Sequence, residues 1–213
     1  MRGLPRPFLL PVAAAALLLT GCKTVHDVKI DSINNPAKSL GVSYRLELLD
    51  PTGSQADSVT AQVHAGVRTA LAARGMFEAP ANAPAGMIIT AEYGVGPGQM
   101  KIIYRPSNTG LGAGALSVGR GTPAPILVFE KYLKLTAREP APESAGRDRR
   151  GRAPRGEELW SLQVSIEDEK RDLAPYLPVL ASTTIDYIGT NTGSEVHLLV
   201  DAATAEVKLK KRR

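Results

Sequence analysis

Cysteine is almost absent from this chain of 213 residues, because Cys22 is the only one. A single thiol cannot form an intramolecular disulfide, so the fold must be stabilised by packing. Histidine is also scarce, with His26, His64 and His197 as the only imidazoles. No cluster of His and Cys ligands occurs, and the sequence therefore predicts neither a metal site nor a bound cofactor.

Aromatic residues and net charge are also low, at 5% of the chain and a formal +5. Removal of an N-terminal leader segment that contains Arg2 and Arg6 would lower the net charge to +3. Nucleic-acid-binding surfaces are strongly basic and often offer aromatic rings for base stacking, so we expect no nucleic-acid partner. After the leader no second long apolar run occurs, and the sequence predicts no transmembrane helix there.

The N-terminal 22 residues have the build of a secretory signal. Basic Arg2 and Arg6 precede an almost wholly apolar run, Phe8–Leu19, and small residues follow this run directly before Cys22. The apolar run is shorter than the roughly 20 residues that cross a bilayer. A basic start, a short apolar segment and a small-residue cleavage site are typical of exported proteins.

The motif Leu19-Thr20-Gly21-Cys22 resembles the lipobox of bacterial lipoproteins. The resemblance implies cleavage between Gly21 and Cys22, a diacylglyceryl thioether on the Cys22 sulfur and acylation of its new amino group. An ordinary secretory signal, cleaved after Ala15 or Ala16, is the alternative, and the lone cysteine at the lipobox position argues against it. Lys23 in place of aspartate implies sorting to the outer membrane rather than retention in the inner membrane.

These features predict four regions. Residues 1–21 are a cleaved signal peptide, and 22–41 are the lipidated N-terminus with a polar tether. Residues 42–201 form a single periplasmic α+β domain with flexible loops at 107–125 and 139–157, and 202–213 are a frayed basic tail.

Alternating apolar and polar residues predict the strands of this domain. The strands are expected over 42–48, 87–93, 100–105, 126–139, 160–166 and 196–200, with a first edge strand over 28–33. Helical spacing predicts a helix over 55–74, with a capping box at Ser54-Gln55-Ala56-Asp57 and Gly75 after its end. A second helix is expected from Leu173 to Ile188. Together they predict an α+β fold with a mainly antiparallel sheet of about five to six strands and two helices on one face.

The glycine-rich stretch 107–125 invites comparison with catalytic and phosphate-binding motifs. A phosphate-binding loop needs Lys-Ser/Thr after its last glycine, whereas Arg120-Gly121 follows Gly119. A serine nucleophile elbow needs Gly-x-Ser-x-Gly, and the stretch around Ser117 contains one residue too many. A flexible hairpin loop is the simpler interpretation, and the sequence predicts no catalytic residue.

Two charged groups have simple interpretations. Glu167, Asp168 and Glu169 are expected to be carboxylates favoured by a helix N-terminus rather than an acid/base pair. The arginines of 138–155 and the basic tail are expected to be solvated, and weak contact with anionic lipid or peptidoglycan is the alternative.

Beyond the lipobox, the mature chain resembles small Gram-negative lipoproteins that carry a domain of unknown function. The resemblance rests on Tyr44 in an early strand, Leu71-x-x-x-Gly75, Leu159-Trp160 and Tyr187-Ile188-Gly189. It implies a fold similar to the α+β modules of envelope-assembly lipoproteins, such as those serving curli secretion or lipopolysaccharide insertion. The expected function is binding or scaffolding of another envelope component without catalysis. The alternative is a cell-wall or lipid hydrolase that uses Ser117, His197 and an acid.

Overall fold

The computed structural model describes residues 25–53, 55–105, 122–141, 156–201 and 207–210. These ranges contain nine strands and two α-helices, and single 3-10 turns at Ala174–Tyr176 and Ile185–Tyr187 flank the second helix. The elements are β1 (Val25–Asn34), β2 (Ser43–Leu49), α1 (Asp57–Ala73), β3 (Phe77–Glu78), β4 (Met87–Val95), β5 (Gln99–Arg105), β6 (Thr122–Arg138), β7 (Glu158–Asp168), α2 (Leu177–Thr184), β8 (Val196–Asp201) and β9 (Val207–Leu209).

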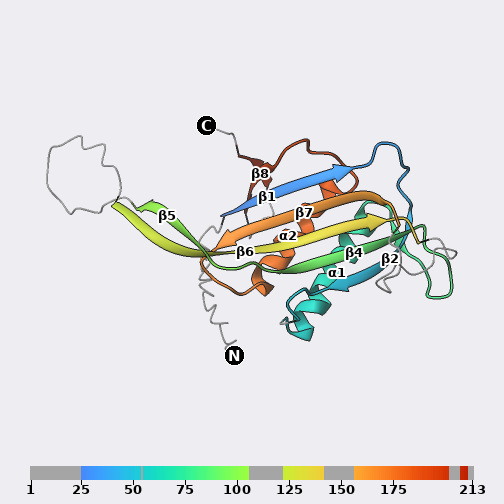
Figure 1. Ribbon diagram of the computed structural model, residues 1–213, viewed down its shortest axis with the longest axis horizontal. Coiled ribbons are helices and arrows are strands. Elements are labelled where there is room, and N and C mark those ends of the chain that lie inside the picture. The colour runs from blue at the N-terminus through green and yellow to red at the C-terminus, as the bar shows by residue number, and fades with distance from the viewer. Residues whose placement is uncertain (1–24, 54, 106–121, 142–155, 202–206, 211–213) are drawn as a thin grey trace, which may run out of the picture.

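One sheet joins all the strands, in the order β3-β2-β4-β6-β7-β1-β8-β9, and β5 pairs with β6 outside this row. Only the β2–β3 and β2–β4 pairs are parallel. Both helices lie over the same face (Figure 1), which confirms the α+β class and the mainly antiparallel sheet. The expected count of five to six strands is wrong for the described residues. The additional strands are β1, which was expected within the tether, and β3 and β9, whose two and three residues are too few to show a period-two pattern.

Alternation along each strand divides the sheet into two faces. In β4, Met87, Ile89, Ala91 and Tyr93 are buried beneath the helices, while the residues between them point to the other face. The same helix-facing core contains Val28, Ile30, Leu133, Leu135, Ala137, Trp160, Leu162, Val164, Ile166, Leu198 and Val200. The face that bears the helices is therefore the apolar one, and the opposite face carries the polar residues of the strands.

Helix α1 forms close to where its spacing predicts. Its apolar stripe, Val59, Val63, Val67, Ala70 and Leu71, is buried against the sheet and α2. Its C-terminal end is followed by a glycine with a positive φ of 75°, as expected for Gly75. The expected capping box is wrong: the helix begins at Asp57 and its N-cap has no side-chain hydrogen bond, because Ala56 occupies that position.

Helix α2 is shorter than expected. Instead of one helix from Leu173 to Ile188, eight helical residues lie between two 3-10 turns, and Pro178 sits in the first helical turn. The helices approach closely where Gly66 of α1 meets Ala181, since a Cβ on that glycine would lie 2.9 Å from the Ala181 Cβ. A larger residue at this position would push the two helices apart.

Strand β1 departs most from the sequence prediction. Residues 28–33 were expected at a sheet edge, within a tether over 22–41, but β1 pairs with β7 on one side and β8 on the other. Val28 and Ile30 are fully buried. The Ser32 hydroxyl lies 3.0 and 2.9 Å from the carbonyl oxygens of Tyr187 and Thr190. Both partner strands come late in the chain, so no local pattern could place β1 between them. The sheet thus begins at Val25.

Strand β6 extends beyond the body of the sheet. Its first part, up to Val128, pairs with β5, and from Phe129 onward it pairs with β7. Residues 99–105 and 122–128, here named the arm, form a hairpin that projects from one end of the sheet (Figure 1). Residues 122–125 therefore belong to a strand rather than to the expected loop, and the remainder of that loop up to residue 121 lies outside the described residues.

The other expected loop and the tail are also partly described. Residues 142–155 lie outside the described ranges, and on either side of them the Glu139 N–H donates to the Glu157 carbonyl at 2.9 Å. Residues 207–209 were expected to fray, but they form β9 against β8. Within the described ranges, no helix combines the length and the apolar composition that crossing a bilayer requires.

Candidate functional site

The sheet face opposite the helices is left open by the described residues. Alternate residues of the central strands point to it, and neighbouring strands bring them into rows. One row contains Glu47 of β2, Thr90 of β4 and Thr136 of β6. The next row along contains Leu49, Glu92 and Lys134, in the same strand order.

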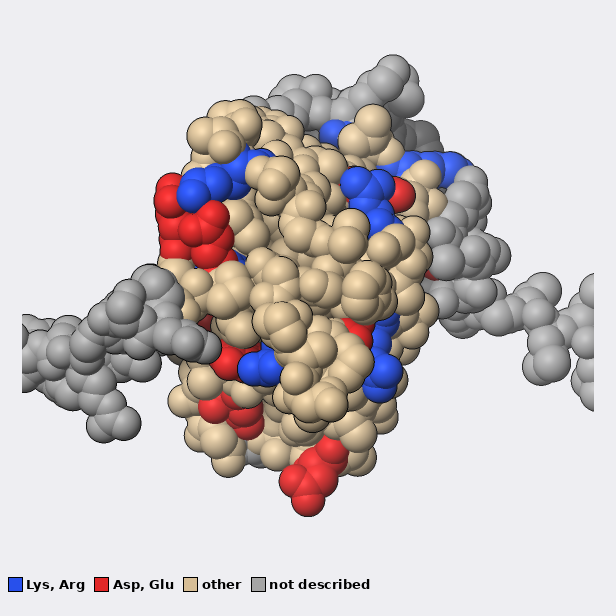
Figure 2. Space-filling model, turned by 90° about the vertical axis from the view of Figure 1, so that its right-hand side faces the viewer, with Lys and Arg blue, Asp and Glu red and all other residues tan. Residues whose placement is uncertain are grey.

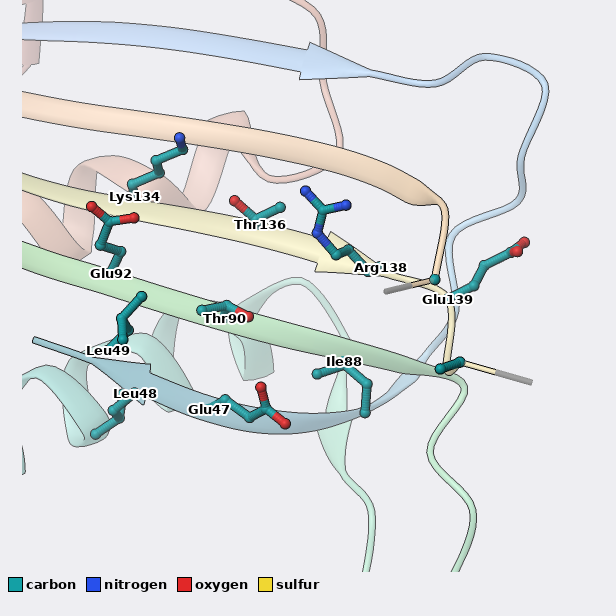
Figure 3. A pocket seen from close by; sticks show the side chains of 12 residues that line it. Glu47, Leu48, Leu49, Ile88, Thr90, Glu92, Lys134, Thr136, Arg138 and Glu139 are labelled. Atoms are coloured by element: carbon teal, nitrogen blue, oxygen red, sulfur yellow. The ribbon is translucent and has the colours of Figure 1, made fainter. Parts of the chain in front are cut away.

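These two rows form the floor of a shallow hollow of about 520 Å³. Figure 3 shows the side chains of Glu92 and Lys134 beside one another on adjacent strands, with Thr90 and Thr136 next to them. Ile88, Arg138, Glu139, Leu48, Ala141 and Gly156 complete the lining. The hollow combines carboxylates, cations and hydroxyls with a few aliphatic side chains.

The charged groups of the hollow differ in their availability. The Arg138 guanidinium is held by Glu158 at 2.6 Å, and the Lys38 ammonium binds Glu139 at 2.8 Å. Among the described residues no ion-pair partner engages Lys134. Its three N–H donors are thus open to a ligand on this face. The polar groups of the described lining are Glu, Lys, Arg and Thr side chains, which offer charge and hydrogen bonds to a ligand.

A network of two ion pairs that share one carboxylate lies on the same face, at the base of the arm. Glu167, near the end of β7, accepts a hydrogen bond from Lys29 of β1 at 2.7 Å and another from Lys101 of β5. Burial alone would raise the pKa of Glu167, but the two ammonium groups hold it below its usual value. The hydrogen bond with Glu167 raises the pKa of Lys29. The carboxylate therefore links the arm to β1 through β7.

Replacing Glu167 with glutamine should lower the free energy of unfolding by about 1 kcal/mol near pH 7, because two half-exposed lysines lose their shared anion. The folded pKa lies below the unfolded 4.5, so this contribution is present above 4.5 and is lost as pH falls through the folded value. Urea unfolding at about pH 7 and about pH 3 should show the two proteins converging in acid. Glu47→Gln is the control, and an undiminished gap at low pH would contradict the assignment.

Lys131 is the one fully buried cation among the described residues, with 0% of its surface exposed on the helix-covered face of β6. Its ammonium donates to the carbonyl oxygens of Phe129 and Asp168 at 3.0 and 2.9 Å. It also lies 5.0 Å from the centre of the Tyr176 ring, within the range of a cation–π contact. Burial lowers the pKa of Lys131, against the opposing effect of the Asp168 carboxylate.

The surroundings of Lys131 satisfy its charge locally. The Tyr176 hydroxyl hydrogen-bonds to the Asp168 carboxylate, and burial together with this bond raises the pKa of Tyr176 to about 12. Burial would raise the pKa of Asp168, yet hydrogen bonds from the Lys170 N–H and Tyr176 and the charge of Lys131 hold it low. His26 packs edge-on against the Tyr176 ring at 5.2 Å. Since the ammonium is enclosed and partnered, we assign Lys131 to the stability of the fold.

The acidic run at 167–169 does not play its expected role. Glu167 and Asp168 end β7 and face opposite sides of the sheet, and neither begins a helix. The carboxylate that meets a helical start is Asp172, which accepts the Ala174 N–H at 3.1 Å. The expectation of helix N-terminal charges is therefore wrong for Glu167 and Asp168, because β7 continues to residue 168.

The histidines lie in three different settings. His197 is on the open face of β8, with Nδ1 3.4 Å from Asp27 and Nε2 2.8 Å from Glu195. His64 is half-buried on α1, and His26 belongs to β1 rather than to a tether. Ser117, which the hydrolase alternative pairs with His197, lies outside the described residues, as do Gly21 and Cys22.

No protein-family model matches the chain, and no curated protein sequence does. A solved structure of a PDZ domain protein from Parabacteroides distasonis is similar over 84% of this chain, with 12% identity and a TM-score of 0.46. This chain covers 40% of that protein. Two structures of PelC dodecamers from Paraburkholderia phytofirmans are similar over 76% and 78% of this chain and over 98% and 99% of PelC, with identities of 11% and 12% and TM-scores of 0.36 and 0.37. At such identities and TM-scores these likenesses carry no functional argument.

Proposed function

We propose that this protein is a bacterial lipoprotein, anchored through Cys22 to the periplasmic face of the outer membrane, that binds another envelope protein without catalysing a reaction. The observation that carries the proposal is the placement of the chain's single cysteine at the end of the lipobox Leu19-Thr20-Gly21-Cys22. An inner-membrane location is the alternative, and Lys23 after the cysteine favours the outer membrane.

The anchor would hold the domain close to the bilayer. Val25, the first residue of β1, follows Cys22 by three residues. Three residues of extended chain span at most about 11 Å. A lipidated Cys22 would thus keep the end of the sheet at which β1 begins close to the membrane surface, rather than separated from it by a long flexible tether.

The open sheet face is the surface that we propose for the partner. Its hollow offers the unpaired Lys134 ammonium, the Thr90 and Thr136 hydroxyls and the Glu47 carboxylate, next to aliphatic side chains. This mixture suits a protein segment that presents both hydrogen-bond donors and acceptors. The basic residues of 138–155 and the tail are proposed only as weak secondary contacts with anionic lipid or peptidoglycan. Arg138 itself is occupied by Glu158.

A bulky side chain in the hollow should weaken binding of the partner. Thr136→Arg places a bulky cation in its centre, beside Lys134, and should reduce recovery of the partner about tenfold after envelope crosslinking and pull-down. Ile33→Arg is the matched control, because this exposed residue lies on β1, two strands away from Thr136 and outside the hollow. Both variants should retain the circular dichroism spectrum of the wild type.

The pull-down separates the two functional classes. Equal recovery of a stoichiometric partner with Thr136→Arg and Ile33→Arg would contradict the open-face assignment, and a monomer without any crosslinked partner would contradict binding itself. Of the groups that the hydrolase alternative needs, the described residues contain His197 with the carboxylates of Asp27 and Glu195, whereas Ser117 lies outside them. We propose the non-enzymatic function because the sequence around Ser117 departs from the Gly-x-Ser-x-Gly motif of a nucleophilic serine.

A further inference from the structure

The arm exposes an apolar surface that the proposed partner site does not use. Met100, Ile102 and Tyr104 of β5 are exposed by 72%, 67% and 70%. Directly across from them on β6 lie Leu127, Pro125 and Pro123, which are also exposed. Residues that are directly opposite on paired strands point to the same side, so these six form one continuous apolar face. This set is here named the arm face.

The arm also lacks negative charge. From residue 93 to residue 129 the sequence contains no Asp or Glu, and its charged residues are Lys101, Arg105 and Arg120. The end of the molecule away from the arm is different: Figure 2 shows blue and red residues there close to each other, among many uncharged ones. An apolar face in a stretch without Asp or Glu adds no negative charge that the anionic surface of a bilayer would repel.

The arm projects from the end of the sheet at which β1 begins. Phe129, where β6 leaves the arm, pairs with Asp168 at the end of β7, and Ile166 of β7 pairs with Val28 of β1. The Lys29–Glu167–Lys101 ion pair joins the same three regions. The arm face and Val25, the first residue of β1, therefore lie at the same end of the molecule (Figure 1).

We propose that the arm face rests on the surface of the bilayer that holds Cys22, as a second contact between the protein and lipid. This inference rests on the proposed anchor. The contact is shallow, because the unpaired backbone groups along a two-stranded arm cannot enter hydrocarbon without losing their hydrogen bonds. The side chains of Met100, Ile102 and Leu127 reach below the headgroups, and the Tyr104 ring lies at their level, as aromatic residues do at membrane interfaces.

The alternative occupant, a second copy of the chain, fits the arm face less well. A stable protein interface buries about 800 Å² on each partner, from roughly 20–30 residues, and the arm face has six. Addition of a further strand to β6 is also disfavoured. One edge of this part of β6 is already paired with β5, and Pro123 and Pro125 lack the N–H groups that a strand at the other edge would need. A lipid surface needs neither a large complementary patch nor a free strand edge.

Site-directed fluorescence tests the contact in the full lipidated chain. Lipidation consumes the Cys22 thiol, so Ile102→Cys offers the only free thiol for a polarity-sensitive dye. The labelled protein is reconstituted in vesicles of phosphatidylethanolamine and phosphatidylglycerol that contain nitroxide-labelled lipid. Asn82→Cys is the control, because Asn82 is exposed in the loop before β4, at the opposite end of that strand from the arm.

The dye at position 102 should shift its emission to shorter wavelength and be quenched by the nitroxide lipid, while the dye at position 82 should show neither change. A charge placed beside it, Met100→Glu, should return the emission of the dye at 102 to that in water. Water-like emission at 102 in the vesicles overturns the proposal. So does a shift that grows with protein density without lipid quenching, which would indicate contact between copies. Intact mass and acyl labelling report the anchor separately, so a missing anchor and a missing arm contact give different results.

Discussion

Replacing Cys22 with alanine is expected to abolish the lipid-modified form and leave an exported protein that is not firmly held by the membrane. The thiol is the group that the lipobox resemblance assigns to the diacylglyceryl thioether, and no other cysteine can replace it. Each buried methylene contributes about 0.8 kcal/mol, so the loss of several acyl chains removes the dominant affinity for the bilayer. Acyl labelling, intact mass and membrane fractionation measure the effect.

The matched control is Thr20→Ala, which changes the variable position of the same motif and keeps Leu19, Gly21 and Cys22. This variant should be lipidated like the wild type. A Cys22→Ala protein that enters the membrane fraction with unchanged mass and acyl label would contradict the anchor. Residual reversible binding of Cys22→Ala to vesicles would not, because the arm face is expected to contribute a weak contact of its own.

Replacing Lys131 with methionine is expected to lower the free energy of unfolding by about 3 kcal/mol, because two buried carbonyl oxygens lose their donor. Those oxygens belong to Phe129 and Asp168, and the Asp168 carboxylate also loses a nearby cation. Methionine keeps most of the aliphatic stem, so little of the loss comes from packing. Urea unfolding near pH 7 measures the difference, provided that the transition remains two-state.

The pH dependence of this variant provides an independent check. The folded pKa of Lys131 is below the unfolded value of 10.5, so the unfolded chain binds more protons between these two values. Stability of the wild type should therefore rise with pH through this window, relative to Lys131→Met, which lacks the titrating group. Lys134→Met, on the open face, should change stability by less than about 0.5 kcal/mol. Equal stability of Lys131→Met and the wild type at all pH values would show that the buried amine contributes nothing.

Lys131 and the base of the arm lie at the same end of the sheet, the end at which β1 begins and which the proposed anchor precedes. Lys131, Asp168 and Tyr176 close the core where β6 and β7 part, and Glu167 ties the arm to β1 on the other face. A firm base for the arm is needed if its apolar face is to meet the bilayer at a defined angle. Glu167→Gln should thus loosen the orientation of the arm while leaving the Cys22 anchor unchanged.

Local pattern predicted most of the longer elements. The stripe of α1, with Val59, Val63 and Val67 at helical spacing, and the alternation of β4 and β7 each describe an element with one buried side. Such patterns depend on residues a few positions apart, which is why they are visible in the sequence. The count of strands was wrong because β3 and β9 are short and are defined by their partners rather than by a pattern of their own.

The candidate site could be predicted only in part. Outside the hollow, alternation places position 131 on the apolar side of β6, but the burial of Lys131 depends on Tyr176 and Asp168, which come from later segments. The hollow joins Glu47, Thr90 and Thr136 from three strands whose register the sequence does not show. Asp27 reaches His197 only because β1 pairs with β8.

By itself, the amino-acid sequence predicted an export signal, a single residue suited to lipid attachment and the α+β class, because each depends on neighbouring residues or on composition; of these three, the structure confirms the α+β class. Only the tertiary structure decided that residues 25–34 form an interior strand, that the open face carries a hollow and that the arm exposes six apolar residues. These features depend on pairing between segments far apart in the chain, where burial and charge compensation are set by partners that no local pattern specifies.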